Sequence, residues 1–368
     1  MSCFVRRSPH PSVAIFSSIQ EVSESLTTTA ITSNISFTII KDDALSGYGG
    51  TVKFSPESLS ANTLQSLAEA EILISEPAVV ASIINHYGEH CFRNLKWCQS
   101  TYVGVDPLFD SNNHKPTAKR NWILTRFAGI FGDPIAEWVL ARIIEHERSF
   151  VASHIDQQNK EWAGSRNEVT QYRYLSSLTI SVLGGCGDIG KCIIKAASFG
   201  FKMKTVAYGK TDRKKSNNND NDMLPDGLDV YTQDLQEALQ MGDYIVSVLP
   251  STPDTKGLLN DETLSIASKI NGGKSPVFLN VGRGDVITEQ SIISSLDRGY
   301  ISAAILDVFG IEPLPRSSPL WNKSNVIISP HVSGITQASD VPKIFFDNYE
   351  RYIAGKDLKY VVDWDKGY

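Results

Sequence analysis

A glycine-rich turn between a strand-like run and a helix-like run constrains the fold of this chain most strongly. The turn is Gly185-Cys186-Gly187-Asp188-Ile189-Gly190, and it joins the β-branched run Thr179–Leu183 to the helical run Lys191–Phe199. In this setting, Gly185 and Gly187 are expected to allow a tight turn and a close approach of the backbone to a pyrophosphate, which a helix N-terminus attracts. Gly190 is expected to let the helix pack closely against the strand. The pattern predicts a dinucleotide cradle within a parallel α/β sheet.

Short β-rich runs alternate with helical runs along most of the chain. At 368 residues the chain exceeds the ~250–300 residues at which single cores stop growing, so we expect two domains. A helical pattern opening at Asp133-Pro134 is expected to begin the second domain, and the stretch 343–353 reads as a closing helix that returns to the first. Strands are expected at 12–16, 36–40, 72–75, 96–99, 179–183, 205–208, 244–249, 277–281, 303–308 and 326–328.

This alternation predicts a parallel α/β fold. The expected substrate-binding domain spans residues 1–131 and is completed by 337–368, and the expected dinucleotide-binding domain spans 132–336. The tract 216–222 is nearly all Asn and Asp and cannot bury a core, so we expect a mobile insert there.

Composition and charge limit the kinds of ligand that we expect this chain to bind. The net charge of −6 and the pI near 5.7 argue against nucleic acid or anionic membranes as ligands. No apolar run approaches the ~20 residues of a membrane span. The five cysteines show neither metal-type pairing nor a disulfide framework, so we expect no metal site and a reducing compartment. Arg6, Arg7 and His10 hint at a targeting segment, but residues 12–16 already read as a strand, and a cytoplasmic protein is expected.

The end of the strand at 205–208 bears on the choice of cofactor. An NAD site usually places a carboxylate there to bind the adenine ribose, but this chain has Gly209. The basic loop that follows, with Lys210, Thr211 and Arg213, suits a 2′-phosphate because it supplies charge-assisted donors without repulsion. We therefore expect NADP(H) to be favoured over NAD(H). Asp212 could act either way, and a solvated basic loop is the alternative interpretation.

Three polar residues each follow an apolar run that ends abruptly, and in open α/β sheets ligands bind at the carboxyl ends of strands. They are Arg283, Glu312 and His331. Reduction of a ketone by hydride needs a proton for the new alkoxide, which His331 could donate, while Glu312 could orient and charge the imidazole. Arg283 could bind a substrate carboxylate and polarise the carbonyl. Together they predict hydride transfer to a 2-oxo acid, although each alone is commonly structural or solvated.

These segments resemble the D-2-hydroxyacid dehydrogenase family, whose Arg, Glu and His motifs match 280–284, 307–313 and 330–334. The resemblance extends over nearly the whole chain and includes Leu249–Thr255 and Ser100–Asp106. Within the family it is similar to the glyoxylate/hydroxypyruvate reductase branch, through Leu124–Arg126, Gly129–Gly132 and Ala136–Trp138.

The resemblance implies an α/β fold of two Rossmann-like parallel-sheet domains, one flavodoxin-like and one NAD(P)-binding, around a cleft. It also implies a D-2-hydroxy acid product, a homodimer joined through the nucleotide domains, and particular site residues. Backbone amides of Val103 and Gly104 would hold the substrate carboxylate opposite Arg283, and Asp307 would meet the nicotinamide carboxamide. The residues expected at the cofactor are Gly185, Cys186, Gly187, Asp188, Ile189, Gly190, Gly209, Lys210, Thr211, Arg213, Leu249, Pro250, Ser251, Thr255, Val281, Gly282, Asp307 and Gly334.

Two other interpretations stay open at this point. The substrate could be a bulkier aryl or branched 2-oxo acid if Tyr102, Trp138, Phe309 and Trp321 wall the pocket, although aromatic residues in α/β folds are more often core. The chain could also be a nucleotide-sensing corepressor-like protein that keeps the triad without turnover, an interpretation that rests on analogy of fold alone.

Overall fold

The computed structural model of the chain describes residues 11–30, 35–47, 52–109, 120–162, 164, 166–211, 223–268 and 275–365. The chain forms two compact units, residues 1–130 with 335–368 and residues 131–334. The predicted insert at 216–222 and Arg213 lie outside the described residues. Among the residues that are described, no helix is both long enough and apolar enough to cross a bilayer.

The first unit contains a five-stranded parallel sheet in the order β2-β1-β5-β6-β7. All four residues of β1, β5 and β6 are buried, as expected for central strands covered on both faces. The chain order reverses between β1 and β5, which makes their carboxyl ends the switch point of this sheet. The strands are β1 (Val13–Phe16), β2 (Phe37–Ile39), β5 (Ile72–Ser75), β6 (Trp97–Ser100) and β7 (Ile123–Thr125), with a small antiparallel pair of β3 (Leu45–Ser46) and β4 (Lys53–Phe54).

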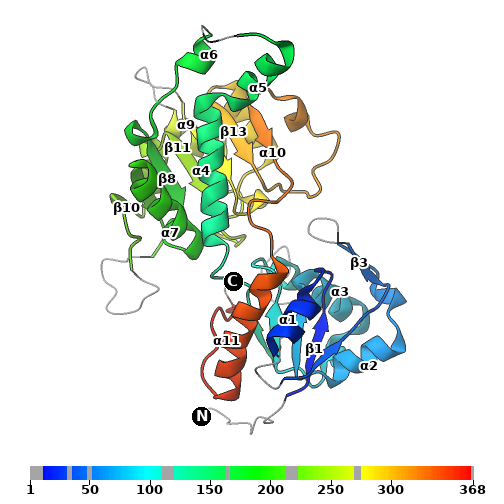
Figure 1. Cartoon of the computed structure of the whole chain (residues 1–368). Helices are drawn as coiled ribbons and strands as arrows, with labels where there is room; N and C mark the ends of the chain where they lie inside the picture. Colours follow the sequence, from blue (N-terminus) through cyan, green and yellow to red (C-terminus); the bar gives the residue numbers. More distant parts are fainter. Residues whose placement is uncertain are drawn as a thin grey trace. The chain divides into compact units, whose positions relative to one another are not determined.

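Helices cover the faces of this sheet (Figure 1). They are α1 (Val22–Ala30), α2 (Ala61–Glu69), α3 (Pro77–Tyr87) and the closing helix α11 (Val341–Ile353). α11 packs beside α1 and stacks Phe345 on Trp97 of β6, with ring centroids 5.4 Å apart. The residues after α11 then run along β7, where the amide of Val362 donates to the carbonyl of Leu124 at 2.8 Å. The closing helix is therefore part of the core of the first unit.

The second unit contains a seven-stranded parallel sheet in the order β10-β9-β8-β11-β12-β13-β14. The chain order reverses between β8 and β11, so the switch point lies at their carboxyl ends. The strands are β8 (Thr179–Leu183), β9 (Lys204–Tyr208), β10 (Val230–Thr232), β11 (Tyr244–Ser247), β12 (Val277–Asn280), β13 (Ala303–Leu306) and β14 (Val326–Ile328).

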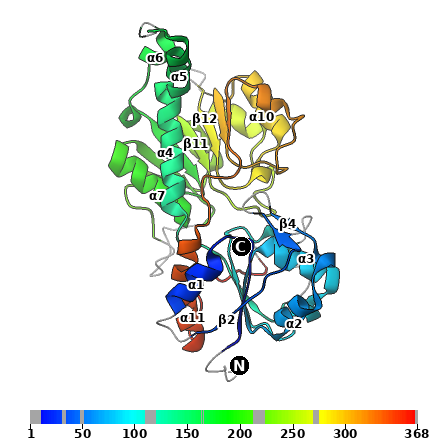
Figure 2. The ribbon, with the colours of Figure 1, turned by 45° about the vertical axis from the view of Figure 1, so that its right-hand side comes forward.

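Two layers of helices enclose the second sheet, with α4 and α7 on one face and α8, α9 and α10 on the other (Figures 1 and 2). Helices α4 and α7 approach closely because Gly132 has no side chain: a Cβ there would lie 2.4 Å from Cys192 Sγ. The helices are α4 (Gly132–Arg148), α5 (Phe150–Asn159), α6 (Asn167–Thr170), α7 (Asp188–Lys195), α8 (Leu235–Met241), α9 (Asp261–Ala267) and α10 (Glu289–Asp297).

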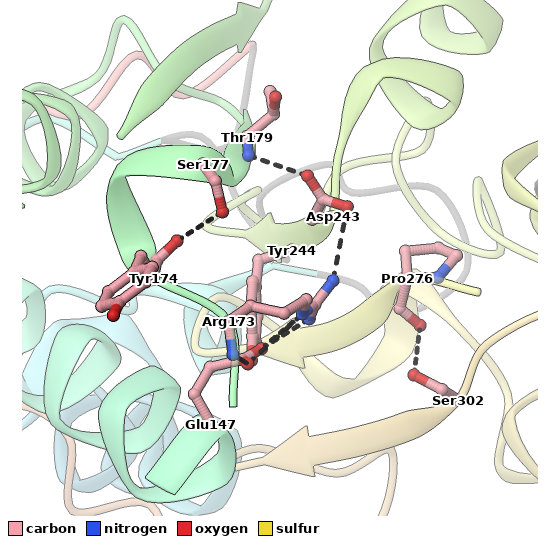
Figure 3. Close-up of polar contacts among 9 residues, drawn as sticks. All are labelled: Glu147, Arg173, Tyr174, Ser177, Thr179, Asp243, Tyr244, Pro276 and Ser302. Atoms are coloured by element: carbon pink, nitrogen blue, oxygen red, sulfur yellow. Dashed lines mark hydrogen bonds and ion pairs between the residues drawn. The ribbon is translucent and has the colours of Figure 1, made fainter. Parts of the chain in front are cut away.

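A network of charged and polar side chains lies at the amino ends of the strands in this sheet (Figure 3). Glu147, at the end of α4, accepts hydrogen bonds from Arg173 Nε at 3.1 Å and from the Tyr244 hydroxyl at 2.7 Å. Arg173 also contacts Asp243, which in turn accepts from the amide of Thr179 at 2.9 Å. Burial acts to raise the pKa of Glu147, but the bonds from Arg173 and Tyr244 lower it overall. The network joins α4 to the first residues of β8 and β11, at the opposite edge from the glycine turn.

Several strands end earlier than their apolar runs. β11, β12 and β13 end at Ser247, Asn280 and Leu306, before the buried Leu249, Val281 and Val308. These three residues are apolar because their loops pack on the core, so hydrophobicity alone overestimates strand length. The short strands β7 and β10 were not predicted at all.

Candidate active site

Six loops of the second unit leave the same edge of its sheet, because all seven strands are parallel. The predicted site residues follow β8, β9, β11, β12, β13 and β14, in that order along the chain. The loops after β8 and β11 flank the switch point, where nucleotides bind in folds of this type.

The glycine turn after β8 is shaped by contacts that exclude side chains. Gly184, which precedes the predicted motif, adopts the left-handed φ of +89° that lets the strand turn sharply into α7. A Cβ on Gly185 would lie 2.7 Å from Ala207 Cβ, and one on Gly190 would lie 2.6 Å from the Gly184 carbonyl oxygen. These two glycines therefore serve close packing, and the positive φ belongs to a residue that the motif did not single out.

Gly187 differs from its neighbours because the space beside it is open. The nearest atom to a Cβ there is the Gly184 carbonyl oxygen at 3.4 Å, an ordinary contact. Gly187 is the N-cap of α7, and Asp188 and Ile189 lie in the first turn of that helix. The first amides of a helix lack intrahelical acceptors and attract anions. The turn thus has the bare backbone and the helix N-terminus that a pyrophosphate requires.

The loop after β9 presents Gly209, Lys210 and Thr211, and Tyr231 of β10 fixes its backbone. The Tyr231 hydroxyl contacts the carbonyl oxygens of Gly209, at 3.1 Å, and Thr211. A Cβ on Gly209 would lie 3.3 Å from that hydroxyl, so Tyr231 occupies the space beside the position of the usual carboxylate. Lys210 pairs with Asp254, with Nζ and Oδ2 3.1 Å apart.

The loop after β11 is shaped by its own hydroxyl groups. Thr255 Oγ1 donates to the Pro250 carbonyl at 2.6 Å, and Ser251 Oγ donates to Asp285 at 2.6 Å. Leu249, Ser251 and Thr255 are buried. These residues form one wall of the switch point, but their hydroxyl groups already take part in loop structure.

Arg283 follows β12 in a loop that packs against the next one without room for side chains. A Cβ on Gly284 would lie 1.9 Å from the carbonyl carbon of Phe309, and one on Gly282 would lie 2.6 Å from the Leu249 carbonyl oxygen. Buried Asn280 shapes the loop, because its side chain donates to the Arg283 carbonyl at 2.9 Å. The half-buried Arg283 donates from one guanidinium nitrogen to the Gly282 carbonyl at 2.9 Å.

His331 and Glu312 form a hydrogen-bonded pair, with His331 Nδ1 and Glu312 Oε2 2.8 Å apart. The other oxygen of Glu312 accepts from the amide of Phe309 at 2.9 Å, so the carboxylate has one orientation. Burial acts to raise the pKa of Glu312, but the bonds from His331 and Phe309 lower it overall. The carboxylate on Nδ1 fixes the orientation of the imidazole and leaves Nε2 as the nitrogen that can serve a substrate.

His331 adopts the left-handed backbone region, with a φ of +56°, which is uncommon for a residue with a side chain. Asp307, fully buried at the end of β13, holds this turn in place. Its backbone carbonyl accepts from the His331 amide at 2.9 Å. Its carboxyl oxygens accept from the Ser329 hydroxyl and from the amides of Val332, at 3.0 Å, and Ser333, at 2.9 Å. The acceptor groups of Asp307 therefore organise the whole His331 turn.

Asp307→Asn is expected to lower the free energy of unfolding by ~1–3 kcal/mol, because an amide cannot accept all of these bonds and its NH₂ group would face other donors. Urea denaturation of both proteins measures the difference. Asp297→Asn is the matched control: that side chain is 59% exposed, and we expect a change within ~0.5 kcal/mol. Equal stability of Asp307→Asn and the unaltered protein would show that the buried carboxyl contributes no net stabilisation.

The remaining predicted residues lie in the first unit and in the loops described above. Val103 and Gly104 are half-buried in the loop after β6 of the first unit, where the Tyr102 amide donates to Ser100 Oγ at 3.0 Å. Cys186 is buried and Pro250 exposed. Gly334 packs against the start of α4, because a Cβ there would lie 2.9 Å from Ile135 Cγ1. The sequence gives no local signal for Gly184 or Tyr231, whose roles depend on contacts between separate segments, whereas Asn280 acts within the loop of Arg283.

Three of the aromatic residues considered for a larger pocket make contacts within the fold. Phe309 packs against the core of the second unit, and Arg142 lies over the ring of Trp138 on α4. Trp321 is half-exposed and donates to the Pro315 carbonyl at 2.9 Å. These contacts favour the core interpretation of Phe309 and give no sign of a shared pocket among the three.

A glycine turn at the switch point of a seven-stranded parallel sheet, with an imidazole–carboxylate pair and an arginine at the same edge, defines a dinucleotide-binding oxidoreductase domain. The sequence profile described as D-isomer specific 2-hydroxyacid dehydrogenase, NAD binding domain, matches residues 140–333. The chain belongs to this family of oxidoreductases, which act on CH–OH donors and bind NAD(P). The predictions of family, enzyme class and parallel α/β fold are thus confirmed.

Individual relatives agree with this membership. The chain is 27% identical over 283 residues to glyoxylate/hydroxypyruvate reductase A of Yersinia enterocolitica, covering 74% of this chain and 82% of that protein. A D-isomer specific 2-hydroxyacid dehydrogenase family protein of Aeromonas salmonicida superposes with a TM-score of 0.76 at 28% identity, covering 97% of this chain and all of that one. The NADPH-dependent glyoxylate/hydroxypyruvate reductase of Sinorhizobium meliloti, solved with NADP and sulfate, has the same fold, with a TM-score of 0.74, 22% identity, and 97% and 100% coverage.

Proposed function

We propose that this protein is an NADP(H)-dependent reductase that converts small 2-oxo acids of the glyoxylate/hydroxypyruvate type into D-2-hydroxy acids. The observation that carries the proposal is the 2.8 Å bond between His331 and Glu312 at the same sheet edge as Arg283 and the glycine turn. The 27% identity to a glyoxylate/hydroxypyruvate reductase supports the choice of small acids. The surroundings of Phe309, Trp138 and Trp321 give no support to the alternative of bulkier acids.

Three residues have separate roles in the proposed reaction. A nicotinamide dinucleotide held at the glycine turn would supply the hydride that the carbonyl carbon of the 2-oxo acid accepts. Protonated His331 donates its proton from Nε2 to the carbonyl oxygen, so that the ketone becomes a secondary alcohol and the imidazole becomes neutral. Glu312, charged because its pKa is lowered, stabilises the imidazolium before transfer. Arg283 would bind the substrate carboxylate, because its planar guanidinium matches both carboxylate oxygens.

The preference for NADP(H) rests on the loop after β9. Gly209 provides no carboxylate for the adenine ribose, and Tyr231 fills the adjoining space. Lys210, whose side chain is 55% exposed, supplies an ammonium group at this position, and Thr211 adds a hydroxyl. A 2′-phosphate gains charge-assisted bonds from such a loop, whereas a ribose hydroxyl gains little.

Exposed apolar side chains support association through the nucleotide domain. Phe150, Val151 and Ile155 on α5 are each about half-exposed, at 53%, 55% and 49%. Such a group on one helix is typical of an interaction surface, and we propose a homodimer that buries it. Light scattering of the purified chain measures its mass, and a monomer at micromolar concentration would contradict the proposal.

Initial rates test the function. We expect glyoxylate and hydroxypyruvate to be reduced with NADPH at higher kcat/KM than with NADH, and phenylpyruvate to react poorly. Strong phenylpyruvate turnover would move the substrate class to bulky acids. Equal efficiency with both cofactors would contradict the NADP(H) preference. Tight cofactor binding without turnover of any 2-oxo acid would favour a nucleotide-sensing protein.

A further inference from the structure

Two opposite charges meet on either side of the glycine turn. Lys210 follows β9, Asp254 lies in the loop after β11, and β8 lies between these two strands. Neighbouring strands are ~4.8 Å apart, so the two loops leave the sheet roughly 10 Å from each other. The 3.1 Å contact between Lys210 Nζ and Asp254 Oδ2 therefore bridges the carboxyl end of β8, where the glycine turn begins.

The backbone beneath each charge is fixed, while the side chains are exposed. Gln233 Nε2 donates to the Lys210 carbonyl at 2.6 Å, and the Tyr231 hydroxyl contacts Gly209. The Thr252 amide donates to Thr255 Oγ1 at 2.9 Å on the other side. The side chains of Lys210 and Asp254 are 55% and 74% exposed, and exposed ion pairs contribute little to stability. The bridge can therefore open without disturbing either loop.

We propose that Asp254 is a cofactor-selectivity residue that opposes the binding of the adenosine 2′-phosphate at Lys210. This inference rests on the proposed NADP(H) preference. The phosphate carries close to two negative charges and three acceptor oxygens, whereas Asp254 carries one charge. Lys210 therefore binds the phosphate in preference to Asp254. Asp254 then remains nearby as a like charge and weakens the complex. A dinucleotide without a 2′-phosphate neither competes for Lys210 nor places a 2′-phosphate beside Asp254. Asp254 therefore weakens binding of the phosphorylated cofactor alone.

Adenosine 2′,5′-bisphosphate and adenosine 5′-monophosphate separate this effect from hydride transfer. Calorimetric titration of the full chain with each ligand gives two Kd values. Asp254→Asn is expected to tighten binding of the bisphosphate by about three- to tenfold, as expected for losing one competing exposed charge, and to leave the monophosphate within about twofold.

Two further variants complete the design. Asp297→Asn is the control, because it breaks a comparable ion pair with Lys323. Lys323 precedes β14 and so lies near the amino ends of the strands, away from the glycine turn. We expect this variant to change neither Kd. Lys210→Met should weaken the bisphosphate alone, and in that background Asp254→Asn should give a smaller gain, because the competition for Lys210 is gone.

The outcomes separate this inference from the proposal beneath it. If the unaltered protein prefers the bisphosphate but Asp254→Asn binds it no more tightly, Asp254 has no selectivity role and the NADP(H) preference stands. If the unaltered protein binds both ligands equally, the NADP(H) preference itself fails, and this inference fails with it.

Discussion

His331→Asn is expected to lower kcat for 2-oxo acid reduction by ~10²–10⁴-fold, the usual contribution of a positioned general acid. Asparagine is the sharpest replacement because it tolerates the left-handed backbone that His331 adopts, with its φ of +56°. The turn held by Asp307 should persist, so only the proton donor is lost. Steady-state rates with glyoxylate and NADPH measure the effect, and calorimetry with NADP⁺ checks that cofactor binding is unchanged.

The pH profile adds a second readout for the same pair. Reduction uses the protonated imidazole, so its rate should fall as pH rises and His331 loses its proton, while the reverse oxidation should gain. Glu312→Gln keeps a hydrogen-bonding group beside Nδ1 but removes the carboxylate, so we expect a lower rate of reduction. A rate that does not change with pH in either direction, together with a His331→Asn rate within tenfold of the original, would show that His331 is not the acid. Single-turnover rates keep product release from masking the effect.

Arg283→Lys is expected to lower kcat/KM by ~10²-fold or more despite keeping the charge. The planar fork of a guanidinium matches a carboxylate in two places, while an ammonium offers a single point charge, and breaking a buried charge pair typically costs ~2–5 kcal/mol. The variant also loses the 2.9 Å bond to the Gly282 carbonyl that sets the direction of the side chain. Saturation curves for glyoxylate measure the loss.

Arg298→Lys serves as the matched control for Arg283→Lys. Arg298 follows α10, its side chain is 59% exposed, and we expect wild-type kinetics from its replacement. Thermal unfolding of both variants should agree with the unaltered protein. Near-normal kcat/KM in Arg283→Lys would show that Arg283 only supports its loop and does not bind the substrate carboxylate.

The parts of the site that follow local patterns were predictable from the sequence. β8 has the predicted bounds, and the run of apolar and β-branched residues ends where the glycine turn begins. The positions of Arg283, Glu312 and His331 at strand ends follow from the same reasoning, since a parallel sheet brings all carboxyl ends to one edge. Their assignments as substrate-binding and catalytic groups stay predictions.

The parts that depend on contacts between distant loops were not predictable. Asp307 meets its donors more than 20 residues later in the chain, and Tyr231 reaches Gly209 from the edge strand β10, which has three residues and no strong pattern. The left-handed glycine of the turn is Gly184, because the conformation depends on how β8 leaves the sheet and not on the motif letters. Such features require the packing to be known.

The contact between Gly284 and Phe309, where a Cβ would lie 1.9 Å from the carbonyl carbon, has a consequence for how this chain can diverge. The loop that carries Arg283 and the loop that leads to Glu312 are interlocked through bare backbone, so neither can gain a side chain or a residue there without displacing the other. The side chain of Lys210, by contrast, is 55% exposed and pairs with the exposed Asp254, while the backbone carbonyl of Lys210 accepts from Gln233. Descendants of this sequence can therefore exchange one cofactor for another while the reacting end of the site keeps its spacing.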